Sequence, residues 1–272
     1  MPESEDVQVR GSAVSDEMDT TVPHAARVWN FWLGGKDHYE VDRAAGEDFL
    51  QVFPGMRAAA QASRGCLGRM VRHLVTECGV RQFLDVGTGL PTAENTHEIA
   101  QEAAPESRIV YVDNDPLVLA HARALLTSTP EGATRYIHAD VREPEAIIEG
   151  AREALDFDQP VALILFGIMG LIPEYDRARS LVDTLLAALP SGSYLALFDV
   201  DNSDPVAVDA ARRYGESGAI PYNHRTPEQI AGYFTGLELV APGVVRSGQW
   251  RTEPSELAQH DTTTLAGLGR KP

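Results

Sequence analysis

The segment RQFLDVGTGLPT, residues 81–92, decides the fold class of this chain. It begins as a short apolar strand, places Asp85 near the end of that strand and continues into a turn that holds Gly87 and Gly89. Glycines at such a turn let the backbone bend sharply and approach a ligand closely. The segment therefore predicts a strand, a ligand-binding turn and a helix, although a glycine pair alone also occurs in ordinary strand-to-helix turns.

Four more apolar segments extend this pattern along the chain. They are RIVYVDND, TRYIHAD, VALILFG and SYLALFDV, residues 108–115, 134–140, 161–167 and 193–200. Helical stretches separate them, and one begins with Asp115 as an N-cap acid and Pro116 as a first-turn proline. Apolar strands that alternate with helices are typical of a parallel sheet covered on both faces. We therefore predict an α/β fold with a mostly parallel sheet.

The C-terminal part of the chain departs from this alternation. TPEQIAGYF, residues 226–234, carries the capping-box pattern of a helix start at Thr226 and Gln229. LELVAP and VVRSGQW, residues 237–242 and 244–250, have the composition of two strands separated by a short turn. Strands this close in sequence favour an antiparallel hairpin, which we expect at the edge of the sheet.

The chain before residue 79 divides into two parts. Residues 1–21 hold six acids and one arginine with little apolar periodicity, which predicts a disordered acidic tail. Residues 22–78 predict a helical cap or lid, and 79–272 the sheet domain. Three helical patterns fill the cap, at residues 25–33, 41–52 and 56–77.

Composition narrows the class of protein and its partners. The chain has 272 residues, 43% of them hydrophobic, and a formal net charge of −17. No basic run is visible, which argues against nucleic acid as a partner. The cysteines, Cys66 and Cys78, and the histidines show neither a disulfide framework nor the spacing of a metal site. We expect a cytoplasmic protein without a membrane partner or a metal, and the oligomeric state stays open.

Three acids end three successive predicted strands: Asp85, Asp113 and Asp140. The carboxyl ends of parallel strands converge on one crevice, so these acids predict a site for a donor-rich nucleoside. A pyrophosphate would be repelled there, and Thr92 stands where the dinucleotide fingerprint needs its third glycine. Taken singly, Asp113 also fits a helix cap and Asp140 a turn residue.

Three of these motifs resemble a known group of enzymes. LDVGTGLP, VYVDNDP and ADVREP resemble the cofactor motifs of class I S-adenosylmethionine-dependent methyltransferases. The chain is more closely similar to a bacterial family of predicted methyltransferases that carry an N-terminal helical segment with an LGGKD run and have no assigned substrate. The resemblance covers roughly residues 22–251. It implies a Rossmann-like sheet with an N-terminal helical cap, S-adenosyl-L-methionine as cofactor, and transfer of its methyl group.

The resemblance also implies a role for individual residues. The methionine end of the cofactor is expected to contact Asp85, Gly87 and Gly89. The ribose and adenine are expected to contact Asp113, Asn114, Asp140 and Val141. The reacting side of the cofactor is expected to contact Phe166 and Gly167. Among these, Asp113 is expected to accept from the ribose hydroxyls and Asp140 from the adenine amino group.

The acceptor is less well determined than the cofactor. LFGIMGLIP after the fourth strand lacks the Asn/Asp-Pro-Pro-Tyr/Phe motif of enzymes that methylate exocyclic amines, which argues against DNA bases. We expect a small-molecule acceptor with an oxygen, nitrogen or sulfur nucleophile. The catalytic residue is not fixed by the sequence. Its candidates are Tyr222 and His224, the latter because histidine titrates near neutral pH, and, less strongly, Lys36 and Asp37.

Alternative interpretations apply to several polar residues of these segments. His224 also fits a histidine of a surface loop, and its neighbours Asn223 and Arg225 belong to the same candidate segment. His97 fits a structural or solvent-facing role. Asp201 fits a turn residue. Two rival functions stay open as well: a nicotinamide-dependent oxidoreductase, and a non-enzymatic module that binds S-adenosylmethionine.

The segment WNFWLGGKDHYEVDR, residues 29–43, contains one of the two lysines of the chain. It lacks the first glycine and the Ser/Thr of a phosphate-binding loop, and Gly34-Gly35 fit a helix end. We also expect this segment to close over the cofactor as a lid. Under this hypothesis Trp29 and Trp32 form apolar walls or face the sulfonium through cation–π contact, although both also fit buried core residues. Arg27, Lys36 and Asp37 are also expected to belong to the site. Lys36 would anchor the cofactor carboxylate or an acidic acceptor.

Overall fold

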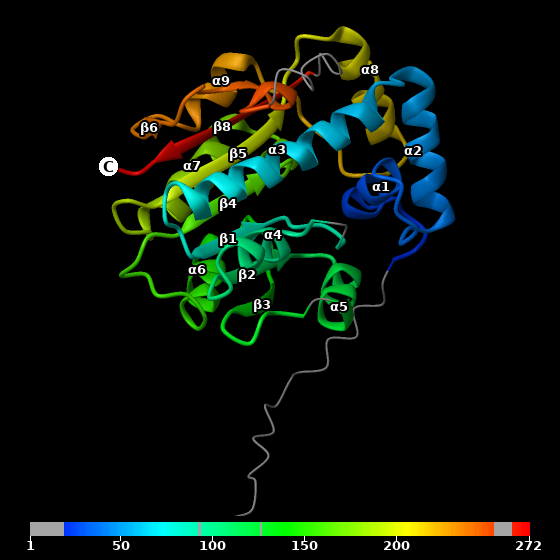
Figure 1. Cartoon of the computed structure of the whole chain (residues 1–272). Coiled ribbons are helices and arrows are strands. Elements are labelled where there is room, and N and C mark those ends of the chain that lie inside the picture. Colours follow the sequence, from blue (N-terminus) through cyan, green and yellow to red (C-terminus); the bar gives the residue numbers. More distant parts are fainter. Residues whose placement is uncertain (1–18, 92–93, 126, 253–262) are drawn as a thin grey trace, which may run out of the picture.

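The computed structural model describes residues 19–91, 94–125, 127–252 and 263–272 (Figure 1). The five strands predicted from apolar segments are present as β1 to β5, within two residues of the expected bounds at either end. The strands are β1 Gln82–Val86, β2 Arg108–Asp113, β3 Ala133–His138, β4 Ala162–Phe166, β5 Tyr194–Val200, β6 Glu238–Leu239, β7 Val245–Arg246 and β8 Thr264–Arg270.

The helices also follow the predicted order. The α-helices are α1 Ala25–Trp32, α2 Glu40–Val52, α3 Met56–Thr76, α4 Thr96–Ala103, α5 Pro116–Leu125, α6 Pro144–Arg152, α7 Tyr175–Ala187, α8 Pro205–Glu216 and α9 Pro227–Gly232. Two short 3-10 helices, η1 Met169–Leu171 and η2 Ser247–Gln249, complete the described elements. Within the described ranges, no helix has both the length and the hydropathy needed to cross a membrane.

The described strands form one mixed sheet in the order β3-β2-β1-β4-β5-β8-β6, with β7 also paired to β8. Strands β1 to β5 are parallel, and β8 is antiparallel to β5. The predicted Rossmann-like α/β class, mostly parallel with an antiparallel edge, is confirmed.

The predicted edge hairpin is wrong in its pairing. β6 and β7 do not pair with each other; each pairs with β8, which has no counterpart in the sequence-based prediction. β8 has the sequence TLAGLGR, and glycine is depleted in strands, so its pattern is weak. The side chains of Phe234, Val244 and Leu237 occupy the space that Cβ atoms would need at its two glycines. A small residue is therefore required there by packing, which local sequence does not reveal.

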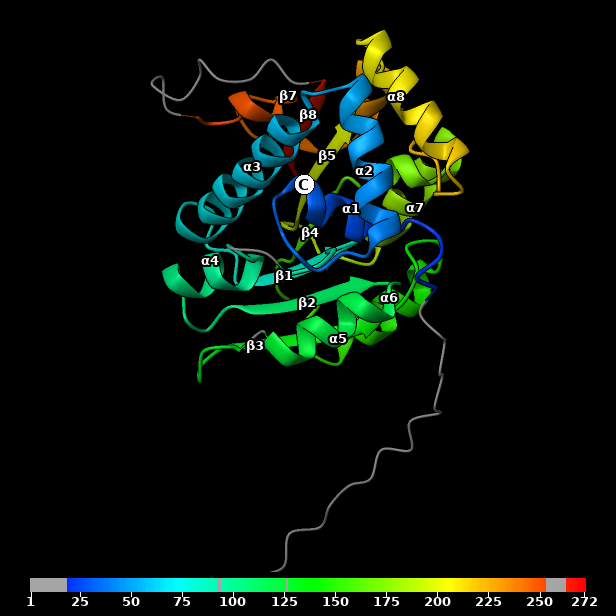
Figure 2. The ribbon, with the colours of Figure 1, turned by 90° about the vertical axis from the view of Figure 1, so that its right-hand side faces the viewer.

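Helices cover both faces of the sheet (Figure 2). Alternate residues of each strand point to opposite faces. Phe83 of β1 packs in a cluster with α3 and α4, whereas Leu84 packs in a second cluster with α6 and α7. Helix α3 thus shares its core with the sheet, although the sequence groups it with α1 and α2. The division of the chain at residues 21/22 and 78/79 stays a prediction, and the tail up to residue 18 lies outside the described residues.

A third apolar cluster joins α1, α2 and the start of α3 to α8. The rings of Trp32, Phe49 and Tyr214 lie close together in it, with centroids 4.9 Å apart for Trp32 and Phe49 and 6.2 Å apart for Phe49 and Tyr214. Aromatic pairs at such distances stabilise beyond the area they bury. This cluster holds α1 and α2 beyond the carboxyl ends of the parallel strands (Figures 1 and 2).

The helix ends read from the sequence are present where expected. Gly34, with φ of 84°, follows α1, and the N–H groups of Gly34 and Gly35 donate to the carbonyls of Phe31 and Asn30. This is the Schellman pattern, which requires a residue that tolerates positive φ. Asp115 caps α5 through Leu117 N at 2.9 Å, and Thr226 and Gln229 form the predicted capping box of α9.

Candidate active site

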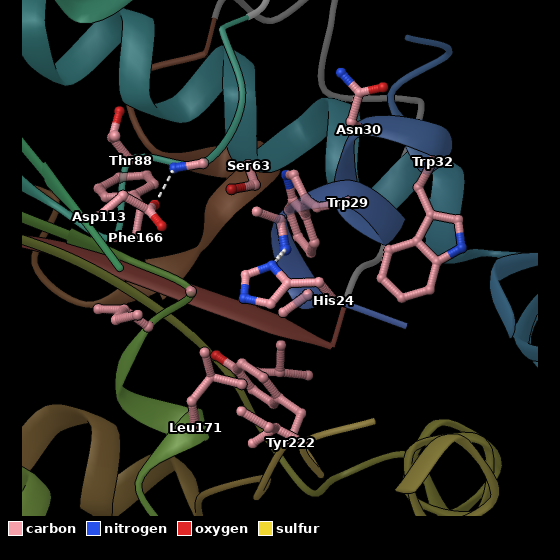
Figure 3. Close-up of a pocket in the computed structure, with 18 of the residues that line it drawn as sticks. His24, Trp29, Asn30, Trp32, Ser63, Thr88, Asp113, Phe166, Leu171 and Tyr222 are labelled. Atoms are coloured by element: carbon pink, nitrogen blue, oxygen red, sulfur yellow. Dashed lines mark hydrogen bonds between the residues drawn. The ribbon is translucent and has the colours of Figure 1, made fainter. Parts of the chain in front are cut away.

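One cavity of about 240 Å³ lies at the carboxyl ends of the parallel strands. Its lining comes from the carboxyl ends of β1 to β5 and the segments that follow them, from the helical segment of α1 to α3, from α8 and the segment up to His224, and from the start of β8. Figure 3 shows Thr88, Asp113 and Phe166 on one side of it and Trp32, Leu171 and Tyr222 on others. The predicted convergence of strand ends and the cap on one space is therefore observed.

Asp113 and the glycine turn form the floor of the cavity. Oδ2 of Asp113 accepts from the N–H of Gly89 at 2.8 Å, and Oδ1 accepts from Asp115 N at 3.0 Å. Burial raises the pKa of the Asp113 carboxyl above its usual value. Gly87 and Gly89 have φ of 74° and 67°, and no atom lies within 4 Å of where a Cβ of Gly89 would be. The backbone at Gly89 is therefore open to a close ligand, while Thr92 lies outside the described residues.

Asp85 is buried beside a charged group that sequence reasoning missed. Its Oδ2 accepts from Oγ1 of Thr96 at 2.7 Å, and burial raises its pKa to about 6. Arg64 of α3 also lines the cavity and interacts electrostatically with Asp85. Nη2 of Arg64 donates to Oδ1 of Asn95 at 3.2 Å, but its buried Nε has no hydrogen-bond partner among the described residues. Burial lowers the pKa of Arg64, as expected for a cation with too few acceptors.

A signal for Arg64 was present in the helical spacing. Arg64 precedes buried Leu67 by three positions and buried Val71 by seven, so it lies on the apolar face of α3. An arginine on such a face is costly unless it has a partner or a ligand. The sequence does not show what this partner or ligand is, because only the fold brings that face of α3 to the end of β1.

Asp140 and Asn114 line the cavity but bind each other and Arg142. Oδ1 of Asp140 accepts from N and Nε of Arg142, both at 2.8 Å, and Oδ2 accepts from Nη2 of Arg142 at 2.5 Å and Nδ2 of Asn114 at 2.9 Å. These bonds, that to the Arg142 side chain first, lower the pKa of Asp140 to about 2. Four donors already use the acceptor sites of this carboxylate. A contact to the adenine amino group stays a prediction and requires one of them to leave, whereas Val141 lines the cavity directly.

Aromatic rings form the wall at the end of β4. Phe166 stacks on Phe198 of β5 with centroids 5.6 Å apart, and Trp29 of α1 contacts Phe198 edge-on at 6.4 Å. Phe166, Gly167 and Trp29 line the cavity. Gly167 has φ of 72° and donates its N–H to the carbonyl of Phe198 at 3.0 Å, which turns the chain away from the sheet.

The segment PYNHRTPEQ contributes two residues to the cavity. Tyr222 and His224 line it, whereas Asn223 and Arg225 point to the η1 loop. Asn223 N donates to the carbonyl of Gly170 at 2.7 Å, and Nη1 of Arg225 donates to the carbonyl of Pro173 at 3.0 Å. These bonds fix the segment, so Tyr222 and His224 are the two candidates that the structure brings to the site.

The helical segment contributes the two predicted tryptophans, Trp29 and Trp32, to the lining, but not the charged residues that were predicted with them. Lys36 is exposed, Asp37 is 3.9 Å from Nδ1 of His121, and neither lines the cavity. Arg27 was also expected in the site, but it is buried away from the cavity with Nε 3.0 Å from Oδ2 of Asp42. A buried guanidinium needs such a partner, which explains the difference. The roles of Lys36 and Asp37 stay predictions that their positions do not support.

Besides the predicted Trp29, the lining from the cap includes His24 and Asn30, which the sequence did not point to (Figure 3). Nδ1 of His24 lies 3.0 Å from Oδ2 of Asp115, which ties the start of α1 to the loop after β2. Two other polar residues are structural: His97 is buried against Oη of Tyr111, and Oδ1 of Asp201 accepts from Ser203 N at 2.8 Å in a turn.

Comparison with known proteins assigns this site to a family. A model described as S-adenosyl methyltransferase matches residues 11–272. The chain belongs to the S-adenosyl methyltransferase family. This methyltransferase is 41% identical to a DUF574 family protein from Streptomyces avermitilis, with a TM-score of 0.90 over 94% of this chain and 100% of that one. A search of curated proteins finds no match.

Two further structures extend the comparison. A candidate methyltransferase from Thermobifida fusca is 39% identical, with a TM-score of 0.85 and coverage of 96% of this chain and 99% of that one. The plantazolicin methyltransferase BpumL, solved with S-adenosylhomocysteine, is 12% identical with a TM-score of 0.51, and the match covers 91% of this chain and 95% of that one. At that identity the last comparison shows the fold alone.

The family makes this protein an S-adenosylmethionine-dependent methyltransferase, as the sequence motifs predict. The cavity fits this cofactor on independent grounds: a buried carboxylate ends β2, the backbone is open at Gly89, and the unpartnered Nε of Arg64 lies beside the site. Neither a nicotinamide-dependent oxidoreductase nor a non-enzymatic module finds support in the family match.

Proposed function

We propose that this methyltransferase acts on a small-molecule acceptor that enters the cavity opposite the glycine turn. The observation that supports the proposal is the continuity of the cavity, which runs from Asp113 and Gly89 to Leu171 and Tyr222 within about 240 Å³. The nearby helical segment closes over it through His24, Trp29 and Asn30. Such a space suits a ligand of limited size rather than a polymer.

S-adenosylmethionine supplies the methyl group as a sulfonium, so the protein mainly provides position and electrostatics. In this proposal Asp113 accepts hydrogen bonds from the ribose hydroxyls, and Gly87 and Gly89 let the backbone approach the cofactor. Asp85 and Arg64 form an adjacent pair of opposite charge, which fits the amino and carboxylate groups of an amino acid. Arg64 thereby takes the role that the sequence suggested for Lys36.

The wall near the sulfonium is aromatic in this proposal. Trp29 and Phe166 line the cavity between the strand ends and α1. Aromatic faces attract cations, so these rings favour the charged sulfonium. The helical segment also excludes water from the site, as the predicted lid would.

The proposal can be tested by following a labelled methyl group. The purified protein is incubated with methyl-labelled S-adenosylmethionine and a bacterial extract separated into small molecules, nucleic acids and proteins. We expect label in the small-molecule fraction alone. Label in nucleic acid or protein, or in no fraction while the cofactor binds, would contradict a small-molecule acceptor.

The remaining expectations on partners belong to the same proposal. The net charge of −17 supports the prediction that nucleic acid is not a partner. A cytoplasmic location and a bacterial source stay predictions.

A further inference from the structure

The end of the cavity away from the glycine turn is apolar. Figure 3 shows Trp32 on one side of the cavity and Leu171 with Tyr222 on another, and all three are well separated from Thr88 and Asp113. We call this part of the lining, away from the glycine turn, the far end. The side chains that form this far end come from the helical segment, the η1 loop and the segment after α8; they include Trp32, Phe49, Phe53, Met56, Leu171 and Ile220. Apolar and aromatic linings of this kind bind ring systems by burying their surface.

The charged groups of the described lining lie at the other end. They are Asp85, Asp113 and Asp140 at or next to the ends of β1, β2 and β3, with Arg64 and Arg142 beside them. A charged acceptor at the far end would lose its hydration without touching a side chain of opposite charge in the lining. The far end therefore favours an acceptor that carries no charge when it binds.

Tyr222 connects this apolar end to a buried carboxylate. Its Oη donates to Oδ1 of Asp199 at 2.5 Å, and Asp199 is fully buried in β5. Oδ1 also accepts from Val200 N, whereas Oδ2 has no hydrogen-bond partner among the described residues. Burial raises the pKa of Asp199 to about 6, so the carboxylate is ionised near neutral pH and able to take up a proton.

His224 supplies a second unpartnered polar group beside Tyr222. The two rings lie 6.1 Å apart, and both line the cavity. Nδ1 of His224 is buried and has no hydrogen-bond partner within the described part of the chain. Burial lowers its pKa to about 4, so the ring is neutral at pH 7 and offers a hydrogen bond without a charge.

We infer that the far end binds an uncharged, ring-containing acceptor through a hydroxyl group that contacts Tyr222 and His224, with Asp199 receiving its proton through Tyr222. This inference rests on the proposed function. An alkylamine acceptor is disfavoured because it is protonated near pH 7 and no carboxylate lines the far end: Asp199 lies behind Tyr222, outside the lining, and already accepts the Tyr222 hydroxyl. A phenolic hydroxyl is neutral there and needs only the removal of one proton.

The proton and electron pairs balance along this route. The acceptor hydroxyl gives its proton to Oη of Tyr222 while the proton of Tyr222 moves to Asp199, which ends neutral. The freed electron pair of the acceptor oxygen forms the bond to the methyl carbon, and the sulfur keeps the pair of the broken carbon–sulfur bond. Asp199 acts through Tyr222 and is a positioning residue in this scheme.

The inference is tested first by binding. The protein saturated with S-adenosylhomocysteine is titrated at pH 7 with 2-naphthol, 2-naphthoate and 2-naphthylmethylamine, followed by calorimetry. We expect 2-naphthol to bind about tenfold or more tightly than either charged probe, since only the charged probes pay for desolvation of an ion. Equal or tighter binding of a charged probe, or no binding of 2-naphthol, would overturn the inference.

The role of Tyr222 is tested by removing its hydroxyl. In Tyr222→Phe we expect the affinity for 2-naphthol to fall about tenfold, because one buried hydrogen bond is lost, while the affinity for 2-methoxynaphthalene stays unchanged. Tyr175→Phe is the matched control, since Tyr175 donates to the carbonyl of Gln229 and does not line the cavity. An equal loss for both probes, or no loss for 2-naphthol, would overturn the role of Tyr222.

The same titration separates the inference from the proposed function. Binding of S-adenosylhomocysteine by each variant shows that its cavity is folded. A wild-type protein that fails to bind S-adenosylhomocysteine contradicts the proposed function itself. A protein that binds it and yet prefers a charged probe contradicts only the inference about the acceptor.

Discussion

Single residues of the site show how burial defines its chemistry. Asp85 and Asp113 are buried at the ends of two neighbouring strands, and burial raises the pKa of both carboxyls. Groups held in this way gain most from a ligand that supplies hydrogen-bond donors. The strand-end acids were identifiable from their spacing, whereas Arg64 needed the packing of α3 against the sheet.

Replacing Asp113 by alanine tests the nucleoside end of the site. We expect the affinity for S-adenosylhomocysteine to fall by about 1–3 kcal/mol, because charge-assisted hydrogen bonds to the ribose are lost. Calorimetry measures the change. Asp48→Ala is the matched control, since Asp48 is exposed on α2 and does not line the cavity. A variant Asp113→Ala with wild-type affinity would remove Asp113 from the cofactor site.

Replacing Arg64 by methionine tests the amino-acid end. We expect affinity for S-adenosylhomocysteine to fall about tenfold or more, since a buried charge-assisted bond to the carboxylate is lost. Affinity for 5′-methylthioadenosine, which lacks that carboxylate, is expected to stay the same. Competition calorimetry with both ligands measures the difference.

Lys36→Ala is the counterpart of this experiment, because Lys36 is the cation that the sequence pointed to. It is exposed and does not line the cavity, so we expect no change in affinity for either ligand. If Lys36→Ala, and not Arg64→Met, weakens binding of S-adenosylhomocysteine selectively, the sequence-based assignment is right and ours is wrong.

At the scale of elements, one buried acid holds the first two helices together. Oδ1 of Asp42 accepts from His24 N at 2.9 Å and from Nε of Arg27 at 3.1 Å, and Oδ2 accepts from Tyr39 N at 2.9 Å. Asp42 thus caps α2 and fixes the start of α1, whose N-cap residue His24 lines the cavity. The position of the cap helices therefore depends on Asp42, a residue that lies outside the site.

Replacing Asp42 by alanine is expected to lower the free energy of unfolding by about 3–5 kcal/mol, because Arg27 is left buried without its partner. Urea denaturation followed by circular dichroism measures this change. Asp48 lies on the same helix and is exposed, so Asp48→Ala should change stability by less than about 0.5 kcal/mol. Equal effects of the two substitutions would show that the buried pair does not stabilise the cap.

For the molecule as a whole, buried carboxylates couple stability to pH. Burial raises the pKa of Asp199 to about 6. Between about pH 4 and pH 6 the unfolded chain loses this proton while the folded protein keeps it. The contribution of Asp199 to stability is therefore fully present below about pH 4 and is lost as the pH rises to about 6.

Asp199→Asn removes this contribution. We compare the change in the free energy of unfolding of each protein when the pH rises from 4 to 6. This change is expected to be more favourable for the variant than for the wild type by up to roughly 3 kcal/mol. His224, whose pKa burial lowers to about 4, acts with the opposite sign but is present in both proteins. Urea denaturation across this pH range gives the difference, and parallel curves for the two proteins would show that Asp199 does not titrate in this window.

The lining of the cavity also shows how much of the site short sequence patterns can predict. The motif segments predicted the three acids, the glycine turn and the end of β4, and all of these line one cavity. The edge strand β8 was missed because its glycines hide its period, and its requirement for small residues comes from Phe234, Leu237 and Val244. Patterns within a segment cannot report on packing partners that are distant in sequence.

The sequence by itself determined the class of sheet, the helix ends and the family, because each is written in short segments with their own period, caps and motifs. The tertiary structure alone decided which charged side chains outside the motif segments reach the cavity. Arg27 pairs with Asp42, Lys36 stays exposed, and Arg64 lines the cavity beside Asp85. The physical reason is burial: a charged group must find a partner or a ligand once it leaves water, and only the folded chain determines which charges leave it.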